Sequence, residues 1–158
     1  MHLLNYLYSK NNEQLYNFKN NEYNINNNLS LLISTNSHPN IFRIKKKKDK
    51  KIIDIDQIRE MIQFTNQTSF NNERKFIIIE DISLLGINYA NALLKSIEEP
   101  NNKTYYILIN NSEFKILETI RSRCLEFKLS LNNSEAIEIV NYNFNSNKYN
   151  DINLDFVN

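Results

Sequence analysis

Three short apolar runs constrain the fold of this chain more than any other feature of its sequence. They occupy residues 29–33, 76–79 and 105–109, and none of them shows a strict alternation of apolar and polar residues. Strands that are covered on both faces of a parallel sheet lack this alternation, whereas strands with one solvated face show it. The three runs therefore predict buried strands of a mostly parallel sheet.

Helical patterns separate these runs. Asp54 and Gln57 form a capping-box signal, and the residues after it place an apolar stripe on one helix face: Ile55, Ile58, Ile62 and Thr65. A second stripe comprises Ala90, Leu93, Leu94 and Ile97. A third helix is predicted at 113–120, with one side formed by Phe114, Leu117 and Ile120. Strands that alternate with helices predict an α/β fold with right-handed crossovers.

The two ends of the chain carry weaker signals. Residues 2–9 predict a helix, and the Asn-rich residues 10–28 predict a loop with at most one helical turn. Residues 135–142 predict a last helix, capped by Asn132 or Ser134. The abundance of Asn, Lys and Ile extends over the whole chain, and we interpret it as AT-rich coding rather than as function.

A chain of 158 residues is long enough for one domain with a hydrophobic core. We divide it into a core at 1–131 and a segment at 132–158, in which the predicted last helix is followed by an Asn-rich tail that docks or frays. The first residues are too polar for a signal peptide, and no apolar run approaches membrane length. We therefore expect a cytoplasmic protein.

Glycine is nearly absent, and this excludes a class of site. Ordinary usage of about 7% would give roughly eleven glycines, yet Gly86 is the only one. A phosphate-binding P-loop needs several glycines, so no G-x-x-x-x-G-K-[ST] pattern fits these residues. The single cysteine, Cys124, likewise excludes an internal disulfide and a cysteine-cluster zinc site. The sequence thus predicts no bound nucleotide, cofactor or metal.

One ordered set of motifs resembles a known family. The helix pattern at 90–97 leads into Glu98-Glu99-Pro100, the apolar run at 105–109 follows, and Ile120-Arg121-Ser122-Arg123-Cys124 comes last. Together these segments resemble the C-terminal part of the AAA+ core in clamp-loader subunits, and within that family the delta-prime group. The resemblance implies a partial AAA+, P-loop NTPase-like, three-layer sandwich that lacks the P-loop.

The acids Glu80 and Asp81 follow the run at 76–79 and have the form of a Walker B strand end. In an active ATPase of this type, the first acid supports Mg²⁺ and the second positions the attacking water. Clamp-loader motor subunits normally carry Asp-Glu here, and this chain carries the reverse order. We interpret the pair as a degenerate site whose carboxylates now cap or solvate the sheet edge.

The resemblance gives Arg123 the role of an arginine finger that completes the ATP site of an adjacent subunit. Such a finger must be rigid and permanently charged where it meets the γ-phosphate. Arg123 lies between a predicted helix and a predicted apolar strand at 125–129, and Ser122 and Cys124 would support the turn. The alternative is a helix-end arginine that is stabilised by the helix dipole and solvent. Arg121 is interpreted as a surface residue.

Two polar segments remain. Asn110 and Asn111 occupy the sensor-1 position of the family, where a turn is the favoured interpretation. The basic run contains Lys45, Lys46, Lys47 and Lys48. It would bind nucleic-acid phosphates or, as we favour, form a solvated loop, because no aromatic residues are interleaved with it. His38-Pro39 just before it predicts a turn.

The resemblance implies a non-hydrolysing, delta-prime-like subunit of the DNA polymerase III clamp loader. Its partners would be gamma/tau-type motor subunits and delta, with the sliding clamp and primed DNA contacted indirectly. ATP and Mg²⁺ would be bound by the neighbouring subunit. Two alternatives stay open: an AAA+ ATPase whose P-loop half is missing from this sequence, and a small nucleic-acid-binding module that uses the basic run.

Overall fold

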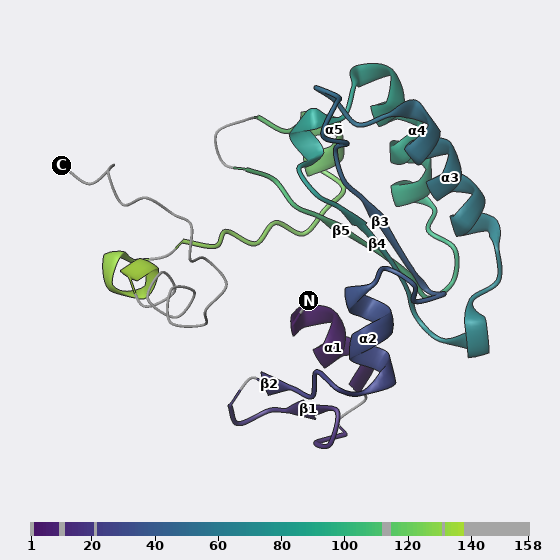
Figure 1. The fold of residues 1–158 in the computed structure, drawn as a ribbon. Helices are drawn as coiled ribbons and strands as arrows, with labels where there is room; N and C mark the ends of the chain where they lie inside the picture. Colours follow the sequence, from purple (N-terminus) through teal and green to yellow (C-terminus); the bar gives the residue numbers. More distant parts are fainter. Residues whose placement is uncertain (1, 10–11, 21, 112–114, 131, 138–158) are drawn as a thin grey trace. The chain divides into compact units, whose positions relative to one another are not determined.

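A parallel three-stranded sheet forms the centre of the fold (Figure 1). Its strands are β3 (Ile41–Ile44), β4 (Lys75–Ile79) and β5 (Thr104–Leu108), with β4 in the middle. All residues of β4 are buried, as expected for a strand that is covered on both faces. The predictions of strands at 76–79 and 105–109 are thus confirmed.

The computed structural model describes the whole chain except residues 1, 10–11, 21, 112–114, 131 and 138–158. The chain divides into one compact unit at Met1–Cys124 and a second at Leu125–Asn158, and the sheet belongs to the first. Among the described residues, no helix is both long and apolar enough to cross a lipid bilayer.

Two helices pack on one face of the sheet. They are α3 (Ile55–Asn66) and α4 (Ile87–Glu98), and both were predicted. The capping box at the start of α3 forms, with the Asp54 N–H donating to Gln57 Oε1 at 3.3 Å. The core on this face contains fully buried side chains from the sheet and both helices, among them Ile77, Ile79, Ile58, Met61 and Leu93.

The opposite face of β4 packs against α1 (His2–Ser9) and α2 (Asn28–Ser34) through the buried residues Phe76, Ile78, Leu4, Tyr8 and Ile33. The helix at 2–9 was predicted, but the strand at 29–33 was a wrong prediction, because these residues lie in α2. A short apolar run fits a buried helix as well as a buried strand, and the capping residue decides. Asn27 Oδ1 accepts from the Ser30 N–H at 2.7 Å, which starts a helix.

Three short strands were not predicted from the sequence. β3 was overlooked because Arg43 interrupts its apolar residues. The predicted loop at 10–28 contains a short antiparallel pair, β1 (Tyr16–Asn17) and β2 (Glu22–Tyr23). The turn at His38-Pro39 is confirmed: the Ile41 N–H donates to the His38 carbonyl at 3.1 Å.

The segment after β5 differs most from its prediction. Helix α5 covers only Glu118–Arg121, and residues 115–117 are not helical, while 113 and 114 lie outside the described residues. Ile116 packs against the core on the α3–α4 face, just before this short helix begins.

The predicted strand at 125–129, in the second unit, is wrong as well, because none of the described strands pairs with it. Leu125, Phe127 and Leu129 are instead 82–97% exposed. Further along, residues 133–137 are helical, and Asn132 Oδ1 accepts from the Glu135 N–H at 2.8 Å. The remainder of the helix predicted at 135–142, and the tail, lie outside the described residues.

Five described positions have a left-handed backbone, and none of them is glycine: Asn36, Asn71, Asn72, Asp81 and Lys103. Asparagine and aspartate tolerate this region better than other residues with a side chain. Gly86 has an ordinary φ of −62° at the start of α4. The fold therefore makes its left-handed corners mainly with asparagine.

Candidate functional site

Arg123 lies two residues after the end of α5, and its guanidinium contacts two elements. Its Nε donates to Oε1 of Glu98, the last residue of α4, at 2.5 Å. Its Nη1 donates to the carbonyl of Thr119 in α5 at 2.8 Å, and lies 3.3 Å from Ser122 Oγ. The side chain of Arg123 is 38% exposed. The guanidinium is thus fixed on one side and open to solvent on the other.

Backbone hydrogen bonds hold the turn that carries Arg123. The N–H groups of Ser122 and Arg123 donate to the carbonyls of Glu118 and Ile120 at 2.9 and 3.1 Å, and the Cys124 N–H donates to Arg121. Ile120 is 2% exposed and anchors α5 in the core, and Cys124 packs against the same core. Burial raises the pKa of the Cys124 thiol, which favours its neutral form.

Arg121 has a different environment from Arg123. Its Nη1 lies 3.6 Å from Oε1 of Glu118 on the same helix, and both side chains are well exposed. An exposed pair of this kind contributes little to stability. Arg121 is therefore a surface residue, and it offers a matched control for Arg123.

The acids Glu80 and Asp81 lie at the carboxyl end of β4. Both oxygens of Glu80 face cations: Oε1 is 3.6 Å from Arg43 Nε and Oε2 is 3.6 Å from Lys45 Nζ. Asp81 has a left-handed φ of 61° and accepts a hydrogen bond from Ser83 Oγ. In the part of the chain that the structure describes, no three His, Cys, Asp or Glu residues are grouped as metal ligands.

Asn110 and Asn111, at the sensor-1 position, lie at the same edge of the sheet as Glu80 and Asp81. The Ile109 N–H donates to the Ile79 carbonyl at 3.0 Å, and the Ile82 N–H donates to the Ile109 carbonyl at 2.8 Å. Asn110 and Asn111 therefore follow β5 beside the turn that contains Glu80 and Asp81. Arg123 and these residues come from different segments, and the side-chain hydrogen bonds of Arg123 within the described residues go to Glu98, Thr119 and Ser122 instead.

The basic run forms the loop between β3 and α3, at residues 45–51. Within it, Lys45 pairs with Glu80, Lys47 Nζ lies 3.4 Å from Asp54 Oδ2, and Lys46 Nζ donates to the Lys50 carbonyl at 3.2 Å. Lys48 is exposed. Several of these lysines thus bind this chain's own acids and carbonyls.

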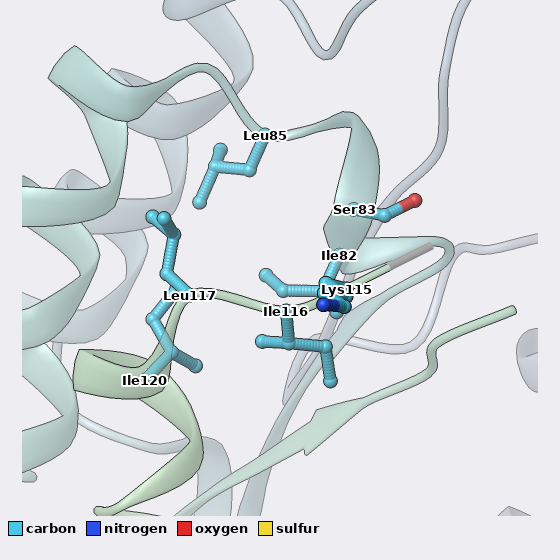
Figure 2. Close-up of a pocket in the computed structure, with 7 residues that line it drawn as sticks. All are labelled: Ile82, Ser83, Leu85, Lys115, Ile116, Leu117 and Ile120. Atoms are coloured by element: carbon cyan, nitrogen blue, oxygen red, sulfur yellow. The ribbon is translucent and has the colours of Figure 1, made fainter. Parts of the chain in front are cut away.

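A pocket of about 180 Å³ lies between the turn after β4 and the segment that enters α5 (Figure 2). The figure shows the side chains of Ile82, Leu85, Ile116, Leu117 and Ile120 around it, with Ser83 and Lys115 as its polar members. The pocket therefore separates the acidic turn from the helix that precedes Arg123.

Sequence reasoning missed the two ion-pair partners. Glu98 was used only as a landmark of the motif, although it lies 25 residues before Arg123 and binds it. Arg43 was not considered, although β3 pairs with β4 and brings it to Glu80. Both pairings arise from strand and helix packing, so no local pattern indicates them.

A parallel sheet between helical layers, with acids at its carboxyl edge and an arginine just past the following helix, is the arrangement of a partial AAA+ module. A crystal structure of a DNA polymerase III gamma subunit-related protein from Thermotoga maritima has a similar fold. It matches with a TM-score of 0.54 and 25% identity, over 67% of this chain and 37% of that one. The family model described as "DNA polymerase III, delta subunit" matches residues 9–133, and the chain belongs to this family.

Curated relatives agree with this assignment. The chain is 37% identical to the DNA polymerase III subunit delta′ of Pseudomonas aeruginosa over 95 residues, which are 60% of this chain and 29% of that protein. It is 32% identical to the subunit of the same name from Escherichia coli K12 over 93 residues, or 59% of this chain and 28% of the relative. The chain thus spans less than a third of the length of these relatives.

Proposed function

We propose that this chain is a non-hydrolysing, delta-prime-like subunit of a DNA polymerase III clamp loader, and that Arg123 acts in trans on the ATP of a neighbouring motor subunit. The observation that carries the proposal is the geometry of the Arg123 guanidinium. Contacts to Glu98 and Thr119 hold one side of it, and 38% of the side chain is exposed. Family membership over residues 9–133 supports the role.

The free edge of the guanidinium suits contact with a phosphate. Among the hydrogen bonds of the described residues, none involves Nη2 of Arg123. A planar, permanently charged group with free N–H donors is suited to the charge that develops on a γ-phosphate during transfer. The core contacts of Ile120 and Cys124 keep the turn rigid, so little ordering is needed when the partner docks.

The acid pair supports the non-hydrolysing part of the proposal. A Walker B carboxylate must be available to Mg²⁺, but Glu80 is paired with Arg43 and Lys45. A cation on each oxygen lowers the attraction of Glu80 for a divalent ion.

The proposed partners are gamma/tau-type motor subunits, which would bind the ATP and Mg²⁺, and the delta subunit. The sliding clamp and primed DNA would be met through the assembly. In this role the chain contributes no cofactor of its own. It couples hydrolysis in its neighbour to closure of the clamp on DNA.

The test is ATP hydrolysis by the cognate motor and delta subunits, with clamp and primed DNA, in the presence of this chain. We expect wild type to stimulate hydrolysis and Arg123→Ala to abolish the stimulation with unchanged binding. A trans arginine finger contributes about 10³-fold or more to the site that it serves. Arg121→Ala is the matched control and should stimulate like wild type.

Two results would contradict the proposal. One is an equal hydrolysis rate with and without the chain at saturating concentration. The other is full stimulation by Arg123→Ala, which would reduce Arg123 to a helix-end residue.

A further inference from the structure

Glu98 and Arg123 link the end of α4 to the turn after α5. The carboxylate takes the Nε–H of the guanidinium, and the Thr119 carbonyl takes an N–H of Nη1. We propose that Glu98 is a positioning residue for Arg123 that aims the Nη2 edge away from the protein, toward the neighbour's phosphate. This inference rests on the proposed function, because it concerns the same trans site.

Two fixed points are needed to orient a planar group on a long side chain. Without Glu98, the guanidinium keeps only the contacts of Nη1 to the Thr119 carbonyl and Ser122 Oγ, so it can rotate about this one nitrogen and the long arginine side chain gains rotamer freedom. The Glu98 contact removes that rotation because it lies on a second N–H of the same plane. Transition-state stabilisation depends steeply on such placement, since an error of about 1 Å costs up to about 10²-fold in rate.

Because the Glu98–Arg123 ion pair is partly exposed, its loss should affect the orientation of Arg123 more than the stability of the fold. The side chains of Glu98 and Arg123 are 44% and 38% exposed. Ion pairs at this exposure contribute little to folding, because water solvates both partners once they separate. Removal of Glu98 should therefore leave the fold intact and disturb mainly the orientation of Arg123.

The neighbouring Glu99 provides a matched control. Glu99 is exposed, its backbone N–H donates to the Lys95 carbonyl, and no ion pair within the described residues involves its carboxylate. Glu98→Ala and Glu99→Ala remove the same side chain and the same charge from adjacent positions. Only the former removes the contact to Arg123.

The experiment uses the clamp-loader ATPase assay above, with kcat and KM for ATP measured for Glu98→Ala, Glu98→Gln, Glu99→Ala and Arg123→Ala. We expect Glu98→Ala to lower kcat about tenfold with KM unchanged, a loss smaller than that of Arg123→Ala. Glu98→Gln keeps an acceptor oxygen and should recover part of the loss. Glu99→Ala should match wild type.

A second readout follows the contact directly. The Arg123 Nε–H resonance in ¹H–¹⁵N spectra of the free chain, assigned by its loss in Arg123→Ala, should shift in Glu98→Ala and stay in place in Glu99→Ala. If Arg123→Ala lowers kcat while Glu98→Ala behaves like Glu99→Ala, the positioning role is overturned and the finger stands. If Arg123→Ala leaves the rate unchanged, the proposed function fails, and this inference fails with it.

Discussion

The ammonium group of Lys75 lies 4.3 Å from the centre of the Phe64 ring and donates to the carbonyl of the same phenylalanine. It also donates to the Gln67 carbonyl at 2.8 Å. Lys75 thus binds the Phe64 carbonyl, which also accepts from the Gln67 N–H, and the Gln67 carbonyl just past α3, and it places a positive charge where the helix dipole favours one. This explains a lysine that is only 3% exposed in the central strand.

Lys75→Met should destabilise the fold. Methionine fills similar space but leaves the Gln67 carbonyl without its donor and the Phe64 carbonyl with only the Gln67 N–H, at a cost of about 1–3 kcal/mol in unfolding free energy. Urea unfolding monitored by circular dichroism measures this. The control is Lys95→Met, at an exposed position of α4, which should stay within about 0.5 kcal/mol of wild type. Equal stability of the two variants would show that water replaces Lys75 at no cost.

The raised pKa of Tyr8 predicts that the free energy of unfolding falls at alkaline pH. Burial, and then the negative charge of Glu73, raise the pKa of Tyr8, and its hydroxyl donates to the Arg74 carbonyl at 2.8 Å. The pKa of Tyr8 in the folded state exceeds the unfolded value of about 10. The neutral Tyr8 side chain therefore contributes fully to the free energy of unfolding below about pH 10, and this contribution is lost as pH rises above about 10. The pKa of Tyr106 is raised as well, so the effect of Tyr8 has to be measured as the difference in unfolding free energy between wild type and a variant without the Tyr8 hydroxyl.

Unfolding free energies of wild type and Tyr8→Phe between pH 8 and pH 11 give that difference. Tyr8→Phe should lose less stability than wild type above pH 10. If the unfolding free energies of the two proteins fell in parallel with rising pH, the alkaline loss of stability would not come from Tyr8.

Asn27→Ala should weaken α2. The Asn27 side chain accepts from the Ser30 N–H and also donates to the Asn24 carbonyl at 2.6 Å. Loss of an N-cap of this kind costs about 0.5–2 kcal/mol. Thermal unfolding of Asn27→Ala beside Asn26→Ala tests the prediction, because Asn26 precedes the cap and should tolerate the change. The interpretation of 28–34 as a capped helix would not survive an unchanged melting temperature.

Cys124 should react slowly with alkylating reagents in the folded protein. Burial raises the pKa of its thiol, and the thiolate is the reactive form. The rate of iodoacetamide modification at pH 7.5 should therefore rise when the chain is unfolded in urea. The pH at which the folded-state rate reaches half its maximum should lie above that of the unfolded chain. A faster reaction in the folded state would indicate an activated cysteine instead.

The sequence predicted the parts of the fold that have long or fully buried patterns. Helices α3 and α4 carry apolar stripes over several turns, and residues 76–79 of β4 are apolar without interruption, so pattern and structure agree. Short segments failed where one residue decided the outcome, as Asn27 did for α2 and Arg43 did for β3. The strand expected at 125–129 needs a partner strand, which its own residues cannot reveal.

For the site, the motifs located Arg123 and the acid pair in the sequence but not their surroundings. The Glu98–Arg123 and Arg43–Glu80 pairs join residues on different elements, so they follow from packing alone. The position of Arg123 after a helix could be predicted from the sequence, whereas that of Arg43 in a strand was missed. The direction in which the donors of either arginine point could not be predicted.

The left-handed asparagines have a consequence for how this fold withstands genomic change. Asn36, Asn71 and Asn72 take backbone conformations that glycine adopts most readily, and the cost of a side chain there is small for asparagine. Glycine codons are rich in G and asparagine codons are rich in A, so this exchange lets base composition drift without loss of the turns. What these corners require is a left-handed backbone angle, and not glycine itself.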